Sequence, residues 1–190
     1  MKKLLLLLLF VANVYAQNDN IYIKQVGNGN IMNLNQGQDL FGNTTGLDTG
    51  NHSQSIWLSG NYNIINTAQQ NTGGDGHNAN LIIQGDLNNV SVTQTGNTQK
   101  QAVVTITGSN NTMLSTQTGN GGHYLNVNET GDGNSAIVNQ SGNIANTANI
   151  SLINAGAPAS VNLTQTGGQT YTISKTCVTA CGTVTVRQGN

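Results

Sequence analysis

Charge is scarce in this chain: Asp, Glu, Lys and Arg together make up 7% of its 190 residues, whereas soluble proteins usually have roughly 25%. The six basic residues are too few to neutralise a row of phosphates, so the composition argues against a nucleic-acid partner. The seven acidic residues are spread thinly along the chain, which leaves no candidate for the paired carboxylates of a glycan-cleaving solenoid. We therefore expect no catalytic residue, no cofactor and no metal centre.

Proline and cysteine are also rare. Proline occurs once, as Pro158, and cysteine twice, as Cys177 and Cys181. Two thiols alone make a weak metal site, and in an exported chain a disulfide between them is favoured. Pro158 is expected in a turn, where its missing N–H removes no hydrogen bond from a strand ladder.

The most apolar run of the chain lies at its N-terminus. Residues 4–11 are apolar, follow Lys2 and Lys3, and lead to Ala16. This order predicts a secretory signal peptide, residues 1–16, cleaved after Ala16. The run is too short to span a bilayer as a helix; a retained N-terminal anchor is the alternative. Cleavage leaves residues 17–190 with a net charge of −3, outside the cytoplasm.

A regularly spaced glutamine is the main signal in the rest of the chain. The last four intervals between these glutamines are 23, 23, 25 and 23 residues, a period typical of stacked repeats. A chain rich in Asn, Gln, Thr and Gly would otherwise suggest disorder, but a disordered tract has no reason to keep a register. The seven glutamines are Gln36, Gln69, Gln94, Gln117, Gln140, Gln165 and Gln188.

Each repeat shows an alternation of apolar and polar residues with a period of two, which is typical of strands. Six residues before the glutamine, five repeats have an asparagine: Asn30, Asn63, Asn88, Asn111 and Asn134. Ala159 and Gly182 take this place in the last two repeats. The first half of each repeat alternates in the same way, and a glycine then opens a turn, where a positive φ costs it nothing. The turn glycines are Gly27, Gly60, Gly85, Gly108, Gly131 and Gly156.

These patterns predict one all-β domain over residues 17–190, a β-solenoid of seven strand-turn-strand rungs forming two facing parallel sheets. No segment shows a helical period. In this arrangement the glutamine and asparagine columns face inward as structural ladders, because stacked amides satisfy one another. The rungs are expected at about residues 19–36, 52–69, 77–94, 100–117, 123–140, 148–165 and 171–188, with a long loop at residues 37–51.

A further column leads the first half of each rung, and the sequence assigns to it Asp19, His52, His77, Lys100, His123, Ala148 and Tyr171. Imidazoles on adjacent rungs could form a pH-dependent column or a weak metal site. The alternative, which the sequence favours, is a strand-edge polar position that faces water.

The last rung departs from the pattern. Thr179 replaces the turn glycine, Gly182 replaces the asparagine, and Lys175 falls among the inward positions. An inward charge protects a sheet edge from pairing. This rung is therefore expected to be a poorer template than the first one.

The repeat resembles that of the curlin family, the subunits of curli-type bacterial fibres. Residues 21–36 read IYIKQVGNGNIMNLNQ and residues 128–142 read NETGDGNSAIVNQSG, close to the family pattern of two Gln-x-Gly segments separated by an asparagine. Alignment to this pattern places a set of residues at the first-half glutamine position: Gln25, Leu58, Ile83, Ile106, Glu129, Asn154 and Cys177.

The resemblance implies a secreted subunit that polymerises end to end into functional amyloid of the biofilm matrix, for adhesion and cell aggregation. The implied partners are further copies of the chain, a dedicated secretion pore with its chaperones, and a second curlin subunit. The implied location is the extracellular fibre or the cell surface.

A second function class is an ice- or surface-binding β-solenoid that acts as a monomer. Flat rows of threonine would favour it, and the predicted outward positions form partial rows. Asn139 and Ser141 interrupt these rows, which consist of Thr93 and Thr95, Thr116 and Thr118, and Thr164 and Thr166.

Overall fold

The computed structural model describes residues 19–37, 51–71 and 75–189. The predicted signal peptide and all but the ends of the predicted loop at residues 37–51 lie outside these ranges. The described residues form strands and turns and contain no helix long and apolar enough to cross a membrane.

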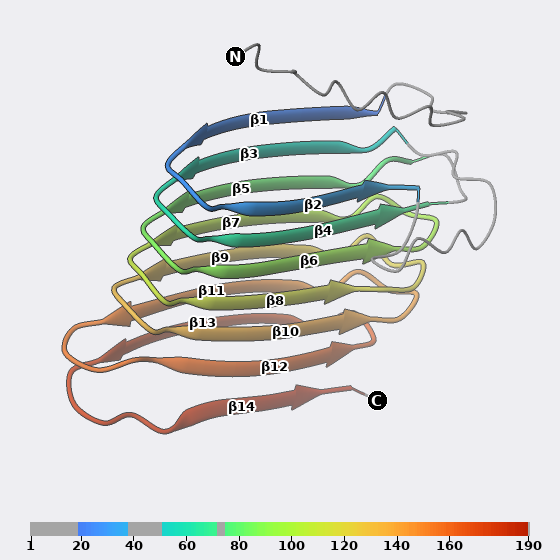
Figure 1. Cartoon of the computed structure of the whole chain (residues 1–190). Helices are drawn as coiled ribbons and strands as arrows, with labels where there is room; N and C mark the ends of the chain where they lie inside the picture. Colours follow the sequence, from blue (N-terminus) through green and yellow to red (C-terminus); the bar gives the residue numbers. More distant parts are fainter. Residues whose placement is uncertain (1–18, 38–50, 72–74, 190) are drawn as a thin grey trace, which may run out of the picture.

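Fourteen strands alternate between two seven-stranded parallel sheets (Figure 1). One sheet has the order β1-β3-β5-β7-β9-β11-β13, and the other has the order β2-β4-β6-β8-β10-β12-β14. First halves thus pair with first halves, and second halves with second halves, which confirms the predicted β-solenoid. The strands are β1 (Asn20–Val26), β2 (Ile31–Gln36), β3 (Ser53–Ser59), β4 (Ile64–Gln70), β5 (Asn78–Gln84), β6 (Asn89–Thr95), β7 (Gln101–Thr107), β8 (Thr112–Gln117), β9 (Tyr124–Thr130), β10 (Ser135–Ser141), β11 (Thr147–Asn154), β12 (Ser160–Thr166), β13 (Thr170–Cys177) and β14 (Thr183–Gln188).

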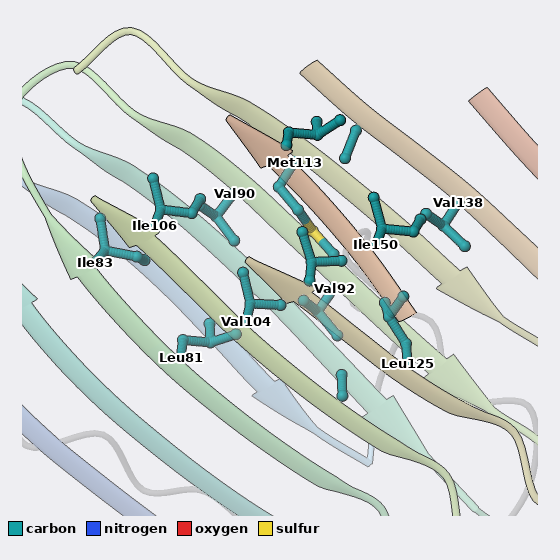
Figure 2. Close-up of a cluster of buried hydrophobic side chains, with 14 of the residues drawn as sticks. Leu81, Ile83, Val90, Val92, Val104, Ile106, Met113, Leu125, Val138 and Ile150 are labelled. Atoms are coloured by element: carbon teal, nitrogen blue, oxygen red, sulfur yellow. The ribbon is translucent and has the colours of Figure 1, made fainter. Parts of the chain in front are cut away.

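The core is a thin layer of aliphatic side chains between the two sheets (Figure 2). Successive residues of a strand point to opposite faces, so alternate residues of β5 and β6 are buried while their neighbours are not. Leu81, Val104 and Val127 lie at one register position on consecutive strands and are fully buried. The same position in β1 is Ile23, which is 44% exposed because no rung covers it.

Glycine is required where the turns stack. Gly60 and Gly85 have φ angles of +134° and +131°, a region that side chains other than glycine rarely adopt. A Cβ at Gly60 would lie 2.0 Å from the carbonyl oxygen of Gly85 on the next rung. The spacing of the rungs therefore excludes any side chain here.

The alignment that the sequence predicts for the first strands of the sixth and seventh rungs is wrong by two residues. The structure pairs Glu129 with Leu152, and Leu152 with Lys175, so Asn154 and Cys177 are not at the register position of Gln25. The two extra residues of the sixth rung lie in the turn between β11 and β12, not before β11. A turn at the edge absorbs an insertion without moving a buried side chain, whereas a slipped strand would exchange its two faces.

The same two-residue shift removes Gly156 from the column of turn glycines. Gly156 has a positive φ of +152° and lies in this longer turn. A Cβ on Gly131 would contact Asn154 rather than Gly156, so Asn154 continues the glycine column.

Candidate functional site

The seven glutamines form one continuous ladder along the second sheet. Each side-chain nitrogen donates to the side-chain oxygen of the next glutamine toward the C-terminus, at 2.8 Å from Gln117 to Gln140. The other five distances lie between 2.8 and 3.3 Å. The same nitrogen also donates across the core to a backbone carbonyl of the first sheet, as from Gln140 to Tyr124 at 2.9 Å. The ladder therefore joins neighbouring rungs and also the two sheets.

The asparagines form a second ladder, at the turn that connects the two halves of a rung. Its direction is opposite: the backbone and side-chain nitrogens of Asn88 donate to Asn63 Oδ1 at 2.8 and 3.0 Å, toward the N-terminus. The last oxygen, that of Asn134, accepts from the backbone N–H of Ala159 at 2.9 Å. Ala159 and Gly182 have no side-chain acceptor, so the ladder ends before the C-terminal rung.

The column that leads the first halves is buried from His52 to Asn146, which corrects the expectation that it faces water. His52, His77 and His123 are at most 1% exposed. Pairing continues the column through Asn146 and Gln169, not through Ala148 and Tyr171, for the same two-residue reason as above. We call Asp19, His52, His77, Lys100, His123, Asn146 and Gln169 the edge column.

Each histidine of the edge column links its own rung to the next one. The Nδ1 atoms of His52 and His77 accept the backbone N–H of the following residue in the column, at 2.9 and 3.2 Å. His123 Nδ1 accepts from the backbone N–H of Asn146 at 3.1 Å. The opposite ring nitrogen contacts a carbonyl oxygen at the end of the second sheet, 2.9 Å from His77 to Gln70 and 2.7 Å from His123 to Thr118.

These bonds fix the tautomer of the ring, with the proton on Nε2 and a lone pair on Nδ1. The lone pair is therefore engaged by a backbone N–H and is not directed at a metal ion. Over residues 19–37, 51–71 and 75–189, no group of three or more His, Cys, Asp or Glu residues could hold a metal.

Lys100 occupies the edge column between two histidines. Its side chain is fully buried, and its ammonium donates to the carbonyl oxygens of Gly119 at 2.7 Å and Thr98 at 3.1 Å. Burial lowers the pKa of Lys100 to about 8. The cation is thus held by neutral carbonyl groups.

Glu129 is a buried acid in the core between the two sheets. It lies between Ile106 and Leu152 in the first sheet, and both of its oxygens are buried without a hydrogen-bond partner among the residues that the structure describes. Burial raises the pKa of Glu129 to about 8. The acid is therefore mostly neutral at pH 7.

The two ends of the solenoid differ in their side chains but share the same open strand edges. Strands β1 and β2 form the N-terminal end of the solenoid, and β13 and β14 form the C-terminal end. Among the described strands, each of these four pairs on one side only. The N-terminal end presents apolar side chains that other rungs bury: Ile21 is 46% and Ile23 44% exposed. At the C-terminal end Val184 is 37% exposed, whereas Ile173 is nearly buried.

The C-terminal rung has a disulfide between Cys177 and Cys181, across the turn between β13 and β14. Lys175 lies at an inward position, and its ammonium donates to the carbonyl oxygens of Ser160, at 3.1 Å, and Gly182. Its charge thus sits at the open end of the core.

The threonine rows lie on the outer face of the second sheet. Thr93, Thr116 and Thr164 share a register position, with Asn139 between the last two. Ala68 precedes this row and Arg187 follows it. The row therefore covers only part of the sheet.

A groove on the outer face of the first sheet was not predicted from the sequence. It has a volume of about 280 Å³ and lies over β1, β3 and β5. Lys24 Nζ lies 5.2 Å from the centre of the Trp57 ring, within the range of a cation–π contact. The signal was present as aromatic and aliphatic residues at outward positions of adjacent rungs. The lining residues are Tyr22, Lys24, Ser55, Trp57, Asn80 and Ile82.

The candidate site therefore consists of contacts that hold stacked rungs together. These are two amide ladders of opposite direction, the edge column, and the unpaired strand edges at the two ends. No family model, no curated protein and no solved structure matches this chain.

Proposed function

We propose that this chain is a secreted, non-catalytic structural subunit that polymerises end to end into curli-like functional amyloid fibres of the biofilm matrix. In this proposal a curli-type pore and its chaperones export it, and the fibre serves adhesion and cell aggregation. The observation that carries the proposal is the complementarity of the two open ends.

Stacking a second copy head to tail continues the glutamine ladder and the apolar columns. Ile23 of the second copy falls on Ile173 of the first, and Leu34 falls on Val186, by extension of the observed register. The new contact covers apolar side chains that are exposed at the N-terminal end, which favours association by the hydrophobic effect. Unpaired strand edges on both sides are templates for a further strand.

The direction of the glutamine ladder selects head-to-tail contacts. Gln36 donates to Gln69, which leaves its oxygen facing the N-terminal end, and Gln188 accepts from Gln165, which leaves its nitrogen facing the C-terminal end. A donor therefore meets an acceptor only when unlike ends join. Two like ends would place two acceptors or two donors opposite each other.

The second candidate is an ice- or surface-binding monomer, which the outward threonines favour. The interruption at Asn139 and the flanking Ala68 and Arg187 weigh against it. A surface that matches a regular lattice requires a regular row.

The deciding experiment is to incubate purified residues 17–190 at micromolar concentration and to follow dye binding, electron microscopy and fibre diffraction. The proposal expects dye-positive fibres with a reflection near ~4.8 Å along the axis. A folded β-rich chain that stays monomeric for days would refute polymerisation. Inhibition of ice growth by that monomer would then support the second candidate.

A further inference from the structure

The edge column couples the stacking of the rungs to the protonation state of histidine. At His123 the ring nitrogen Nδ1 serves as an acceptor for the backbone N–H of Asn146, at 3.1 Å, in a position that is 1% exposed. A proton on Nδ1 would turn this acceptor into a donor, so two N–H groups would face each other. The bond between the rungs would be lost, and a charge would be buried.

The surroundings of His123 oppose a positive charge. Lys100 precedes it in the column, and on its other side lies the neutral Asn146. The second sheet presents to it the neutral carbonyl of Thr118, at 2.7 Å. The pKa of His123 is lowered by burial, the largest effect, and also by the charge of Lys100, while the backbone carbonyls of Thr118 and Gly142 raise it in part.

Charged groups also lie near the other two histidines. Asp19 Oδ1 accepts the backbone N–H of His52 at 2.7 Å, and the rings of His52 and His77 are 5.0 Å apart. His77 also neighbours Lys100 in the column, and Asp75 precedes it by two residues in the loop.

Asn146 shows that the fold needs a donor and an acceptor at this position, not an imidazole. Its Nδ2 donates to the carbonyl of Ser141 at 2.8 Å, as Nε2 of His123 does to Thr118. Its Oδ1 accepts the backbone N–H of Gln169 at 2.9 Å, as Nδ1 of His123 does from Asn146. An amide makes both bonds and does not titrate between pH 4 and pH 8.

We propose that His123 forms an acid-sensitive switch in the solenoid: its neutral ring holds two consecutive rungs in register, and its protonation releases that contact. The switch belongs to the folded chain itself and does not depend on polymerisation.

The expected pH dependence has a definite sign. A histidine that is kept neutral in the fold binds a proton more readily in the unfolded chain, where the pKa of its imidazole is about 6.5. Stability is thus present above pH 6.5 and is lost as the pH falls below it. As the pH falls below 6.5, His123 thus raises the unfolding constant by up to about tenfold per pH unit.

Glu129 has the opposite pH dependence over part of this range, since its raised pKa favours the fold at lower pH. The informative quantity is therefore the ratio of unfolding constants between wild type and a variant, not the curve of the wild type alone. His123→Asn is the matched variant because Asn146 already performs both bonds in the neighbouring rung.

The test is urea unfolding of residues 17–190 at pH 8, 7, 6 and 5, for wild type, His123→Asn and Asn146→His. Wild type and His123→Asn should have similar unfolding constants at pH 8, and their ratio should grow by up to about tenfold per pH unit below 6.5. For Asn146→His the ratio should change in the opposite direction: the unfolding constant of the variant should exceed that of wild type increasingly as the pH falls, because the variant takes up one more proton on unfolding. A ratio that stays constant from pH 8 to pH 5 in both variants would overturn the proposal.

Nitrogen-15 NMR of the imidazoles in the wild-type chain gives a second readout that needs neither unfolding nor a folded variant, and it applies to soluble and fibrous protein alike. The proposal expects His123 to keep the Nε2–H tautomer, with Nδ1 unprotonated, as the pH falls to 5.5. Protonation of His123 near pH 6.5 without loss of β structure would overturn it.

Discussion

The hydroxyl of Thr67 donates to Oε1 of Gln54 across the core at 2.6 Å, and both side chains are buried. The bond joins β4 of one sheet to β3 of the other. Ser115 lies two rungs further at the same register position as Thr67, and its buried hydroxyl has no hydrogen-bond partner in the described part of the chain. Two hydroxyls of one column thus differ in whether a partner exists across the core.

We expect Ser115→Ala to raise the free energy of unfolding by about 1 kcal/mol, because it removes a buried hydroxyl without a hydrogen bond. Thr67→Val should lower it by about 1–3 kcal/mol, because it leaves Gln54 Oε1 unpaired. Urea denaturation of the two variants is the measurement. If both substitutions shift the midpoint in the same direction, then partnering does not decide the effect of a hydroxyl in this core.

The glutamine ladder should matter more than the surface beside it. We expect the pair Gln117→Ala and Gln140→Ala to slow fibre growth strongly and to cost roughly 1–3 kcal/mol for each buried group left unpaired. The control pair is Thr118→Ala and Ser141→Ala, which alters neighbouring side chains and keeps the ladder intact. Dye-binding kinetics and urea midpoints should separate the two pairs of variants. Equal effects of both pairs on growth rate and stability would show that the glutamine ladder contributes no more than the surface beside it.

Glu129 should make the fold less stable as the pH rises. Its pKa is raised to about 8 by burial, so the folded state favours the protonated acid. The stabilisation relative to the ionised form is complete below the unfolded pKa near 4.5 and is lost as the pH rises toward 8. By pH 7 the loss amounts to roughly 3 kcal/mol.

Glu129→Gln and Glu129→Leu should both abolish this pH dependence, and Leu should also stabilise the chain, as Leu152 does at the same register position. Denaturation curves at pH 5, 6, 7 and 8 provide the measurement. A wild-type chain whose stability relative to Glu129→Leu does not change over this range would show that the acid is not buried as described.

The C-terminal rung lacks the acceptor that the backbone N–H of Asn30 would meet across a joint between copies. A Cβ at Gly182 would contact nothing within 4 Å, so an asparagine fits there. Gly182→Asn should therefore lower the critical concentration for growth about fivefold, the equivalent of one hydrogen bond of about 1 kcal/mol.

Gly182→Ala is the control for this prediction, since it adds a side chain without an acceptor. Seeded growth at a series of monomer concentrations gives the critical concentration of each variant. A fall that is the same for Ala and Asn would assign the effect to the loss of glycine, and no fall in either would place the joint elsewhere.

The sequence determined the parts of this protein that repeat. An alternation of period two, with an amide at one fixed phase, can bury its apolar residues only as stacked strands, since a slip of one residue would expose them all. For this reason the positions of Gln94 and Asn88 follow from the sequence, as does the turn at Gly85.

Only the tertiary structure decided where the residues that depart from the repeat lie. The two extra residues of the sixth rung could lie on either side of β11, and the strand pattern alone does not distinguish Leu152 from Asn154 as the partner of Glu129. Packing decides, because a turn accommodates extra residues at lower cost than a core does. Because of the same two-residue shift, Asn146 and not Ala148 belongs to the edge column.

The environment of the polar residues was also a tertiary result. By residue type His123 was expected to face water, yet it is buried, because a carbonyl of the second sheet and an N–H of the next rung satisfy both ring nitrogens. These partners lie 5 and 23 residues away along the chain. The sequence shows that a histidine recurs, whereas only the winding of the chain determines which groups surround it, and therefore whether it can accept a proton.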